Sequence, residues 1–308
     1  MEHKPKIIAI VGPTASGKSD LAVELAREFS GEVVSADSRQ VYRDMDIGTG
    51  KITVAEMKGV PHHLLDVASP SRVFSVAEYK QKSDKAIAQI LKRNKLPILA
   101  GGTGFYIQAV ADGVVLPDVK PDKDLRKTLG AITTDELFNM LKKIDPDRAE
   151  TIDAKNPRRL VRAIEIATAL GKVPTAPHES PYETLFIGIT VANDLLRERI
   201  HKRLRSRMDD GMIAEIEQLH TAGLSWKRME DLGLEYRYCA RYLQGKMTKD
   251  DMLARLELEI VHYAKRQYTW FRKDKRVRWV PLGGYAEAAA IAKNFLKENP
   301  FLNEEGFL

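Results

Sequence analysis

The sequence predicts an α/β protein, in which a parallel, helix-covered sheet carries a helical insertion and a helix-rich C-terminal half. Three observations lead to this prediction. Short apolar runs with the composition of strands alternate with helical patterns, which is typical of a parallel sheet covered by helices. A proline-punctuated series of helical pieces interrupts this alternation. From residue 193 to residue 270 the pattern is almost entirely helical.

The expected strands are short runs rich in apolar and β-branched residues, at 6–11, 32–36, 96–100, 185–191 and 277–280. Between the first two runs, residues 18–29 have helical spacing, with Leu21, Leu25 and Phe29 four residues apart. A second helix is predicted over 76–93. The run at 277–280 lies beyond the helical region, so we expect the chain to return to the sheet there.

The segment from 117 to 182 contains seven prolines that separate helical pieces. One piece covers 134–144, and another covers 160–170 and is followed by Gly171 as a C-terminal cap. We therefore predict two parts. Residues 1–116 and 183–308 form the catalytic core with the C-terminal helices, and 117–182 form a helical insertion domain. We expect the tail after Pro300 to fray.

Composition excludes several classes of protein. The chain has 308 residues, of which 44% are hydrophobic and 30% charged, as in a globular protein in water. It has no apolar run of membrane-spanning length and begins without the apolar core of a signal peptide, so we expect a cytoplasmic protein with no membrane contact. Its single cysteine, Cys239, cannot form an internal disulfide or a cysteine-rich zinc site, and its aromatic surroundings indicate a buried structural thiol. The sequence does not give the oligomeric state; our working expectation is a monomer.

Positive charge is concentrated in the C-terminal half of a chain whose formal net charge is +6. Residues 197–207 hold six arginines and lysines against one acid, and residues 265–278 hold seven against one. A solvated helix face is the ordinary explanation of one such segment. Two together favour a polyanionic partner, since a nucleic acid presents a row of phosphates.

A phosphate-binding loop follows the first predicted strand. Gly12-Pro13-Thr14-Ala15-Ser16-Gly17-Lys18-Ser19 fits the pattern G-x-x-x-x-G-K-[ST] and opens a helix. The glycines let backbone N–H groups converge on an anion, the helix N-terminus and Lys18 add positive potential, and the Ser19 hydroxyl is a ligand for Mg²⁺. The sequence thus predicts a P-loop NTPase-like core with a diphosphate or triphosphate site and Mg²⁺ as cofactor. It does not identify ATP as the ligand.

Asp37 ends the second predicted strand, so it should lie at the same sheet edge as the phosphate loop. It could act as a general base, as a partner of Mg²⁺ through water, or as a helix N-cap. The strand at 96–100 is followed by Gly101-Gly102-Thr103-Gly104, without the carboxylate that ordinary P-loop ATPases place there. This argues against ATP hydrolysis and leaves Asp37 as the best-placed base. Thr103 could hydrogen-bond at the reacting centre, or the four residues could simply form a tight turn.

Together these motifs resemble the tRNA dimethylallyltransferase family, in its bacterial form. The resemblance rests on residues 12–19, 37–42, 45–49, 61–66, 101–103, 156–160 and 264–270, which keep the family's order over most of the chain. The pair Asp37-Ser38 with Asp46-Ile47-Gly48-Thr49 and the stretch 265–270 are its most specific parts. The chain departs from the family at Glu235, where members often have glycine before Tyr-Arg, so we assign no contact to 233–237.

The resemblance implies that a dimethylallyl group passes from its diphosphate to N6 of the adenosine on the 3′ side of the anticodon, in tRNAs that read codons beginning with U. Asp37 would accept the N6 proton and Thr103 would hold the amine. The loop amides, Lys18, Mg²⁺ on Ser19 and Arg203 would stabilise the leaving diphosphate. Charge alone does not distinguish Arg203 from Arg199 or Arg207.

An anticodon stem-loop would reach this site only with its adenine flipped out of the stack. The resemblance places tRNA contacts near the reacting centre, on the insertion and on a C-terminal helix, at Asp37, Ser38, Arg39, Gln40, Thr103, Arg158, Arg159, Arg162, Lys265 and Arg266. We expect Trp270 to face the core of its helix. The adjacent pair His62-His63 favours a structural or substrate-side role over metal binding, because neighbouring side chains point apart.

Two other functions remain compatible with part of the sequence. A small-molecule kinase would also have the phosphate loop and Asp37, but not the long basic helical half. A non-catalytic RNA-binding protein would not need intact Lys18, Ser19 and Asp37. The sequence leaves open the set of tRNAs, the preference among prenyl donors, and any movement of the insertion.

Overall fold

The computed structural model describes residues 4–174 and 179–297; the tail after Pro300, which we expected to fray, lies outside them. The strands are β1 (Lys6–Val11), β2 (Gly31–Ser35), β3 (His62–His63), β4 (Leu96–Gly101), β5 (Glu183–Thr190) and β6 (Arg278–Pro281). The helices are α1 (Lys18–Glu28), α2 (Val54–Met57), α3 (Val76–Lys92), α4 (Gly104–Ala111), α5 (Lys123–Leu129), α6 (Thr134–Ile144), α7 (Pro146–Thr151), α8 (Pro157–Leu170), α9 (Asn193–Asp209), α10 (Met212–Thr221), α11 (Trp226–Leu232), α12 (Leu234–Leu243), α13 (Lys249–Phe271) and α14 (Tyr285–Lys297).

The six strands form one parallel sheet in the order β3-β2-β4-β1-β5-β6. The predicted parallel sheet is therefore confirmed, with strand ends that lie at most two residues from the predicted ones. β3 was missed because it is only two residues long and joins the sheet through backbone pairing with Val33 and Val34. All strands point the same way, so their carboxyl ends, including those of β1, β2 and β4, meet at one edge.

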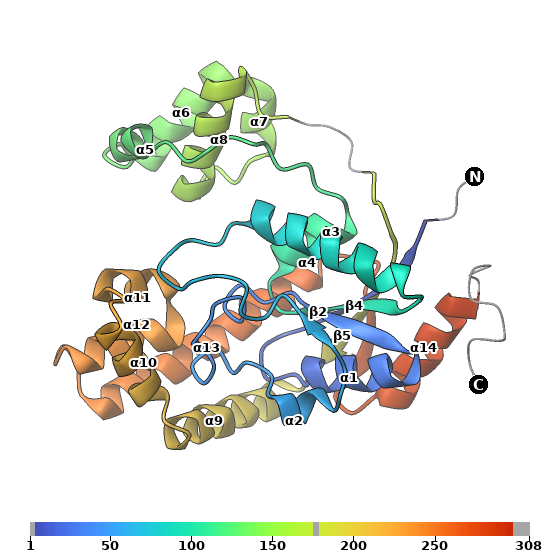
Figure 1. Cartoon of the computed structure of the whole chain (residues 1–308). Helices are drawn as coiled ribbons and strands as arrows, with labels where there is room; N and C mark the ends of the chain where they lie inside the picture. Colours follow the sequence, from blue (N-terminus) through green and yellow to red (C-terminus); the bar gives the residue numbers. More distant parts are fainter. Residues whose placement is uncertain (1–3, 175–178, 298–308) are drawn as a thin grey trace. The chain divides into compact units, whose positions relative to one another are not determined.

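Each face of the sheet is covered by helices, as Figure 1 shows. Alternate residues of β1 point to opposite faces: Ile8 and Ile10 belong to a core with α1 and α14, whereas Ile7 and Ala9 pack with α3 and α4. Burial on both faces explains why β1 is apolar at every position after Lys6 rather than alternating.

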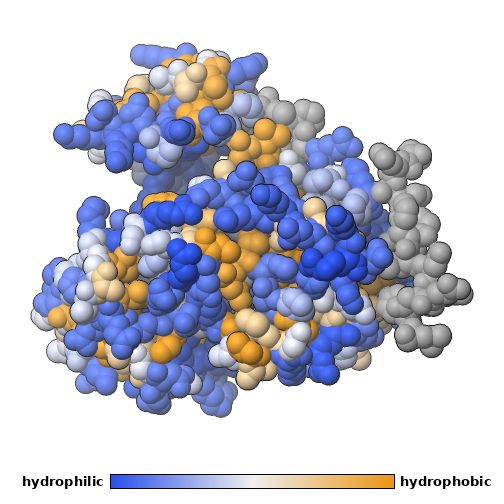
Figure 2. Space-filling model, in the orientation of Figure 1, coloured by the Kyte–Doolittle hydropathy of each residue, from blue (hydrophilic) through white to orange (hydrophobic). Residues whose placement is uncertain are grey.

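The C-terminal helices α9 to α13 extend the second of these cores. Cys239 on α12 is completely buried there, as predicted, and burial raises the pKa of its thiol to about 12. The prediction for Trp270 is wrong, since this side chain is 40% exposed. The buried face of α13 runs instead through Ala264, Gln267 and Phe271. The surface of α9 to α12 is mainly hydrophilic on the face shown in Figure 2.

Residues 114–179 form a second compact unit, separate from 1–113 and 180–308. Its core consists of α6 and α8 side chains such as Leu141 and Ile164. Helix α8 begins three residues earlier than the predicted piece because Asn156 caps it and Pro157 occupies its first position. Our expected boundaries were 117 and 182. The compact unit has its boundaries at 114 and 179 instead, and Ser180 belongs to the larger unit, where its hydroxyl donates a hydrogen bond to the Ala111 carbonyl.

No helix within residues 4–174 and 179–297 has the length and apolar character needed to span a bilayer.

Candidate active site

The phosphate loop connects β1 to α1 at the carboxyl edge of the sheet. Gly12 adopts a φ of 147°, and a Cβ there would lie 3.2 Å from both the Ile189 carbonyl and the Ser16 hydroxyl. Only glycine therefore allows the chain to turn so close to β5. The ammonium of Lys18 folds back to donate a hydrogen bond to the Pro13 carbonyl at 2.6 Å. The loop is thus already curled in the way an anion-binding nest requires.

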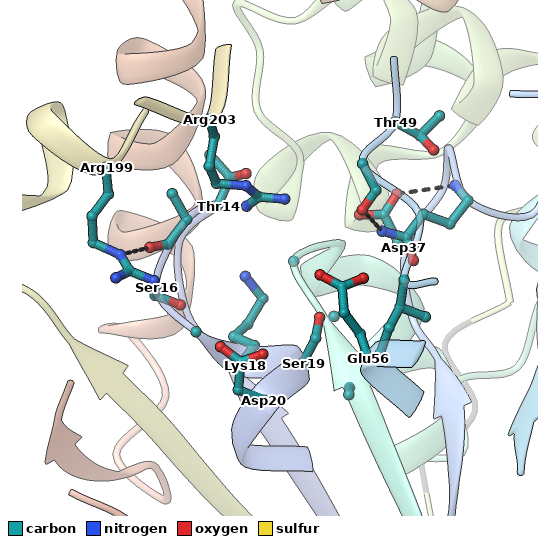
Figure 3. A pocket seen from close by; sticks show the side chains of 18 of the residues that line it. Thr14, Ser16, Lys18, Ser19, Asp20, Asp37, Thr49, Glu56, Arg199 and Arg203 are labelled. Atoms are coloured by element: carbon teal, nitrogen blue, oxygen red, sulfur yellow. Dashed lines mark hydrogen bonds between the residues drawn. The ribbon is translucent and has the colours of Figure 1, made fainter. Parts of the chain in front are cut away.

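A pocket of about 330 Å³ opens above this loop. Figure 3 shows Lys18 and Ser19 between two walls, with Arg199 and Arg203 on one side and Asp37 and Glu56 on the other. The structure thus brings the predicted diphosphate site and the predicted base into one cavity. The complete lining is Thr14, Ala15, Ser16, Gly17, Lys18, Ser19, Asp20, Asp37, Gln40, Thr49, Gly50, Ile52, Glu56, Ala100, Gly101, Gly102, Arg199, Arg203 and Arg207.

Burial has a large effect on Lys18. Loss of hydration lowers its pKa to about 7, while the nearby Asp37 carboxylate acts in the opposite direction. Without an anion in the pocket, the ammonium is therefore easily deprotonated near neutral pH. A bound diphosphate would favour the charged form.

Three arginines of α9 face the pocket because they are spaced four residues apart on one side of the helix. Arg199 donates to the Ala15 carbonyl at 2.7 Å, and Arg207 donates to the Glu235 carboxylate at 3.0 Å. Loss of hydration among the pocket residues and the neighbouring Arg207 lower the pKa of Arg203 to about 10, so this guanidinium remains charged at neutral pH. The sequence singled out Arg203 by resemblance, but the structure places all three arginines in the site.

The segment after β2 is held by the side chains of Asp37 and Thr103. Asp37 Oδ1 accepts the backbone N–H groups of Arg39 at 2.8 Å and Gln40 at 3.4 Å. The alternative that Asp37 caps a helix is wrong, since a turn follows it and the next helix is α2. Within the residues that the structure describes, no hydrogen bond involves its second oxygen, Oδ2. Thr103 accepts the N–H of Ser38 at 3.0 Å.

The glycines between the end of β4 and the start of α4 permit three close approaches. A Cβ on Gly101 would lie 2.1 Å from the Ala36 carbonyl oxygen, one on Gly102 would lie 2.0 Å from the Gln267 amide, and one on Gly104 would lie 2.2 Å from the Trp270 indole. The sequence left open whether residues 101–104 form a functional element or a tight turn. Gly101 ends β4 and Gly104 begins α4, so only Gly102 and Thr103 form the connection, and the Thr103 hydroxyl also positions the segment of Asp37.

Several residues of the site were not found from the sequence. Glu215 on α10 accepts the N–H groups of Asp46, Ile47 and Gly48, at 2.6–3.0 Å, and the Tyr236 hydroxyl at 2.8 Å. This carboxylate fixes the segment that carries Thr49 and Gly50 into the pocket. No local pattern marks Glu215, because its backbone partners lie about 170 residues earlier in the chain.

The oxygen donors near Ser19 fit a magnesium ion. Ser19, Asp20 and Glu56 all line the pocket, and carboxylate and hydroxyl oxygens are the ligands that Mg²⁺ prefers. Glu56 was not anticipated in this place, although its local pattern is readable, since Thr53 and Glu56 form a capping box at the start of α2. The described residues contain no group of three or more His, Cys, Asp or Glu arranged for a metal.

The histidine pair has structural contacts, as expected. His63 Nε2 lies 2.6 Å from the Glu32 carboxylate, and His62 Nδ1 lies 2.9 Å from the Val60 carbonyl.

The basic residues expected to contact tRNA differ in their exposure and in their internal contacts. Lys265 and Arg266 are exposed on α13, and Arg158 and Arg159 are exposed at the start of α8. Arg162 is engaged internally, since it pairs with the buried Glu165 and donates to the Val119 carbonyl. Ser38, Arg39, Gln40 and Thr103 are half-buried. The Gln40 amide donates to the Gly50 carbonyl at 3.1 Å.

A parallel sheet with a phosphate loop at its carboxyl edge, facing a carboxylate across one pocket, defines a P-loop-type enzyme of the group-transfer class. Residues 40–274 match the model of the family described as IPP transferase. The tRNA dimethylallyltransferase 1 of Geotalea daltonii is 43% identical over 296 residues, covering 94% of each chain. The chain belongs to the IPP transferase family, as its motifs predicted.

Solved structures agree with this assignment. The tRNA isopentenylpyrophosphate transferase of Bacillus halodurans matches with a TM-score of 0.74 and 39% identity, over 96% of this chain and 98% of that one. A eukaryotic dimethylallyltransferase acting on tRNA matches with a TM-score of 0.83 and 27% identity, over 97% of this chain and 81% of that one.

Proposed function

We propose that this enzyme transfers the dimethylallyl group of dimethylallyl diphosphate to N6 of the adenosine on the 3′ side of the anticodon, in tRNAs reading codons that begin with U. The main observation in favour is the pocket itself, in which an anion-binding loop with three arginines faces the Asp37 carboxylate. The names of the relatives, tRNA dimethylallyltransferases, agree with this chemistry. Because the proposed substrate is tRNA, we expect the reaction in the cytoplasm, and we expect the enzyme to act as a monomer.

The proposed reaction forms one bond and breaks one. The lone pair of N6 attacks C1 of the donor, the C1–O bond breaks, and its electron pair leaves with the diphosphate. Asp37 takes the proton that N6 loses. The amine is a weak nucleophile because its lone pair is delocalised into the adenine ring. Catalysis must therefore come from positioning, from stabilising the leaving group and from proton removal.

The residues divide into two groups by these tasks. The loop amides, Lys18 and Arg203, joined by Arg199 and Arg207, would neutralise the charge that develops on the diphosphate. On the opposite wall, the turn that engages Oδ1 of Asp37 leaves Oδ2 available to face the amine. Thr103 would help to hold the amine in line and already orients this turn.

Mg²⁺ would bind beside the diphosphate. The Ser19 hydroxyl would hold it, with the carboxylates of Asp20 and Glu56 near enough to bind it directly or through water. When bound, the ion would supply further positive charge to the leaving group.

Two exposed basic groups would contact the anticodon stem-loop. Lys265 and Arg266 lie on α13, the helix whose Gln267 accepts the Thr14 N–H of the phosphate loop. Arg158 and Arg159 lie on the insertion unit. Neutralising phosphates with such side chains releases counterions, so binding should weaken as salt rises.

One experiment tests the proposal. The protein and Mg²⁺ are incubated with unmodified tRNA and either labelled dimethylallyl diphosphate or γ-labelled ATP. We expect prenyl label on the tRNA and no transfer of phosphate. Phosphate transfer to a small molecule without prenyl transfer would instead identify a kinase, and tRNA binding without either reaction would identify a binding protein.

A further inference from the structure

A buried glutamine connects the two walls of the site. Gln267 lies on α13 and is only 7% exposed. Its Oε1 accepts the backbone N–H of Thr14 at 2.7 Å, and its Nε2 donates to the Gly102 carbonyl at 2.9 Å. One side chain therefore joins the phosphate loop to the turn after β4, from a position more than 160 residues later in the chain.

This bridge has little freedom to rearrange. A Cβ on Gly102 would overlap the Gln267 amide at 2.0 Å, so the backbone of the turn lies directly against the side chain. A buried peptide group that loses its hydrogen-bond partner destabilises its local conformation. Removal of the amide would leave two such groups, one on each segment.

Both segments lead directly to reacting groups. On one side, Thr14 is the third residue of the loop that ends in Lys18 and Ser19. On the other side, Gly102 precedes Thr103, whose hydroxyl holds the N–H of Ser38 beside Asp37. The paired strand ends of β1 and β4, Val11 and Gly101, already hold these segments side by side, and the Gln267 side chain adds a second link beyond the strands. The bond to Thr14 also engages one amide of the loop, so the diphosphate would rely mainly on the amides of the later loop residues.

We propose that Gln267 is a positioning residue, which holds the phosphate loop and the Asp37 turn at the separation that prenyl transfer requires. This inference rests on the proposed function, because the separation matters only if donor and amine meet between these walls. Gln267 touches neither substrate. It acts through Thr14 on the donor side and through Gly102 and Thr103 on the acceptor side.

Two substitutions separate this role from simple packing. Gln267→Met keeps the length and volume of the side chain but removes both hydrogen bonds. Gln267→Glu keeps the acceptor for Thr14, and only its protonated form can donate to the Gly102 carbonyl. Gln244→Met is the matched control, because Gln244 at the end of α12 donates to the Ala240 carbonyl and accepts from Lys246, and none of these residues lines the pocket.

The experiment measures kcat/KM for prenyl transfer between pH 5.5 and 8.5, within the range where the wild type remains folded, and the Kd of inorganic diphosphate with Mg²⁺ by calorimetry. A displacement of about 1 Å can lower turnover on the order of 10²-fold, and we expect a loss of that size for Gln267→Met. Its Kd for diphosphate should rise, its tRNA affinity should stay unchanged, and Gln244→Met should match the wild type. The kcat/KM of Gln267→Glu, divided by that of the wild type, should increase as the pH falls. The same ratio for Gln267→Met should stay constant with pH.

Wild-type kinetics in Gln267→Met, or a Gln267→Glu ratio that does not change with pH, would overturn the positioning role. An inactive wild type that still binds diphosphate would contradict the proposed function instead. The calorimetric comparison of the variants would then still report whether Gln267 organises the phosphate loop.

Discussion

The side-chain hydroxyl of Thr103 accepts the backbone N–H of Ser38 at 3.0 Å. Residues 65 positions apart thereby connect the turn after β4 to the segment that carries Asp37. The Thr103 backbone N–H also donates to the Ala36 carbonyl at 3.1 Å, so the two segments are joined twice. The orientation of the proposed base thus depends on a threonine of the neighbouring strand end.

We therefore expect Thr103→Val to lower kcat by about tenfold to a hundredfold, because it removes the acceptor and leaves the Ser38 N–H without a partner. Thr103→Ser should recover most of the rate, since it restores the hydroxyl. Steady-state kinetics of both variants provide the measurement. If Thr103→Val is as active as Thr103→Ser, the hydrogen bond between Thr103 and Ser38 does not orient Asp37.

Replacement of Asp37 should affect chemistry much more than binding. We expect Asp37→Asn to lower kcat on the order of 10²- to 10⁴-fold, the range for loss of a general base, with tRNA affinity unchanged. Single-turnover kinetics and a tRNA binding titration measure the two effects. Asp209→Asn, at the exposed end of α9, is the control. A loss of affinity that accounts for the whole drop in kcat/KM would make Asp37 a binding residue.

Diphosphate binding should be coupled to proton uptake by Lys18. Burial holds its pKa at about 7 in the free enzyme, and a bound anion favours the protonated form, so the pKa rises on binding. Above pH 7 the complex therefore takes up a proton, and affinity decreases as the pH rises. Calorimetry at pH 8, in buffers with different ionisation enthalpies, measures this uptake.

Lys18→Arg supplies the comparison for that experiment, since arginine stays charged and cannot take up the proton. Any change in the protonation of diphosphate itself contributes equally in the wild type and in Lys18→Arg. Equal uptake by the wild type and Lys18→Arg would show that Lys18 is already fully protonated before binding.

Glu235 should weaken diphosphate binding through its pairing with Arg207. Burial raises the pKa of this carboxyl group, and Arg207 acts in the opposite direction. Glu235→Gln keeps a hydrogen-bond acceptor for Arg207 but removes a negative charge beside the arginines. We expect the Kd of inorganic diphosphate to fall on the order of tenfold, equivalent to ~1.4 kcal/mol.

The matched control is Glu198→Gln on α9, since Glu198 pairs with Lys202 in solvent and should leave the Kd unchanged. A weaker affinity in Glu235→Gln would mean that the ion pair mainly holds Arg207 in position.

The basic face of α13 should set the salt dependence of tRNA binding. Each phosphate contact contributes about 0.7–0.9 to the slope of log K against log salt, so Lys265→Ala and Arg266→Ala should each reduce its magnitude by roughly that amount. Lys293→Ala on α14 serves as the control. Filter binding of unmodified tRNA at several salt concentrations gives the slopes. Identical slopes in all four proteins would assign Lys265 and Arg266 to an ordinary solvated helix face.

Local sequence patterns were sufficient to predict much of the fold and of the site. The phosphate loop, the apolar strands and the Asp37 position depend on residues close together in the chain, and their ligand-binding edge follows from the parallel arrangement of the strands. The same holds for α6, which spans the predicted residues 134–144. The motifs in the sequence are enough by themselves to indicate the family. The strand β3 was missed because two residues carry no apolar pattern of their own.

Only the tertiary structure decided the contacts between residues that lie far apart in the sequence. It showed that Arg199, Arg203 and Arg207 all reach the pocket, that Glu215 clamps the segment 46–48, and that Gln267 joins the two walls. It also exposed Trp270 and buried Gln267 on the same helix, although hydropathy favours the opposite. A polar side chain is stable in the interior only where it finds hydrogen-bond partners, which for Gln267 are backbone groups. Those partners, the Thr14 N–H and the Gly102 carbonyl, come together only when the sheet has formed.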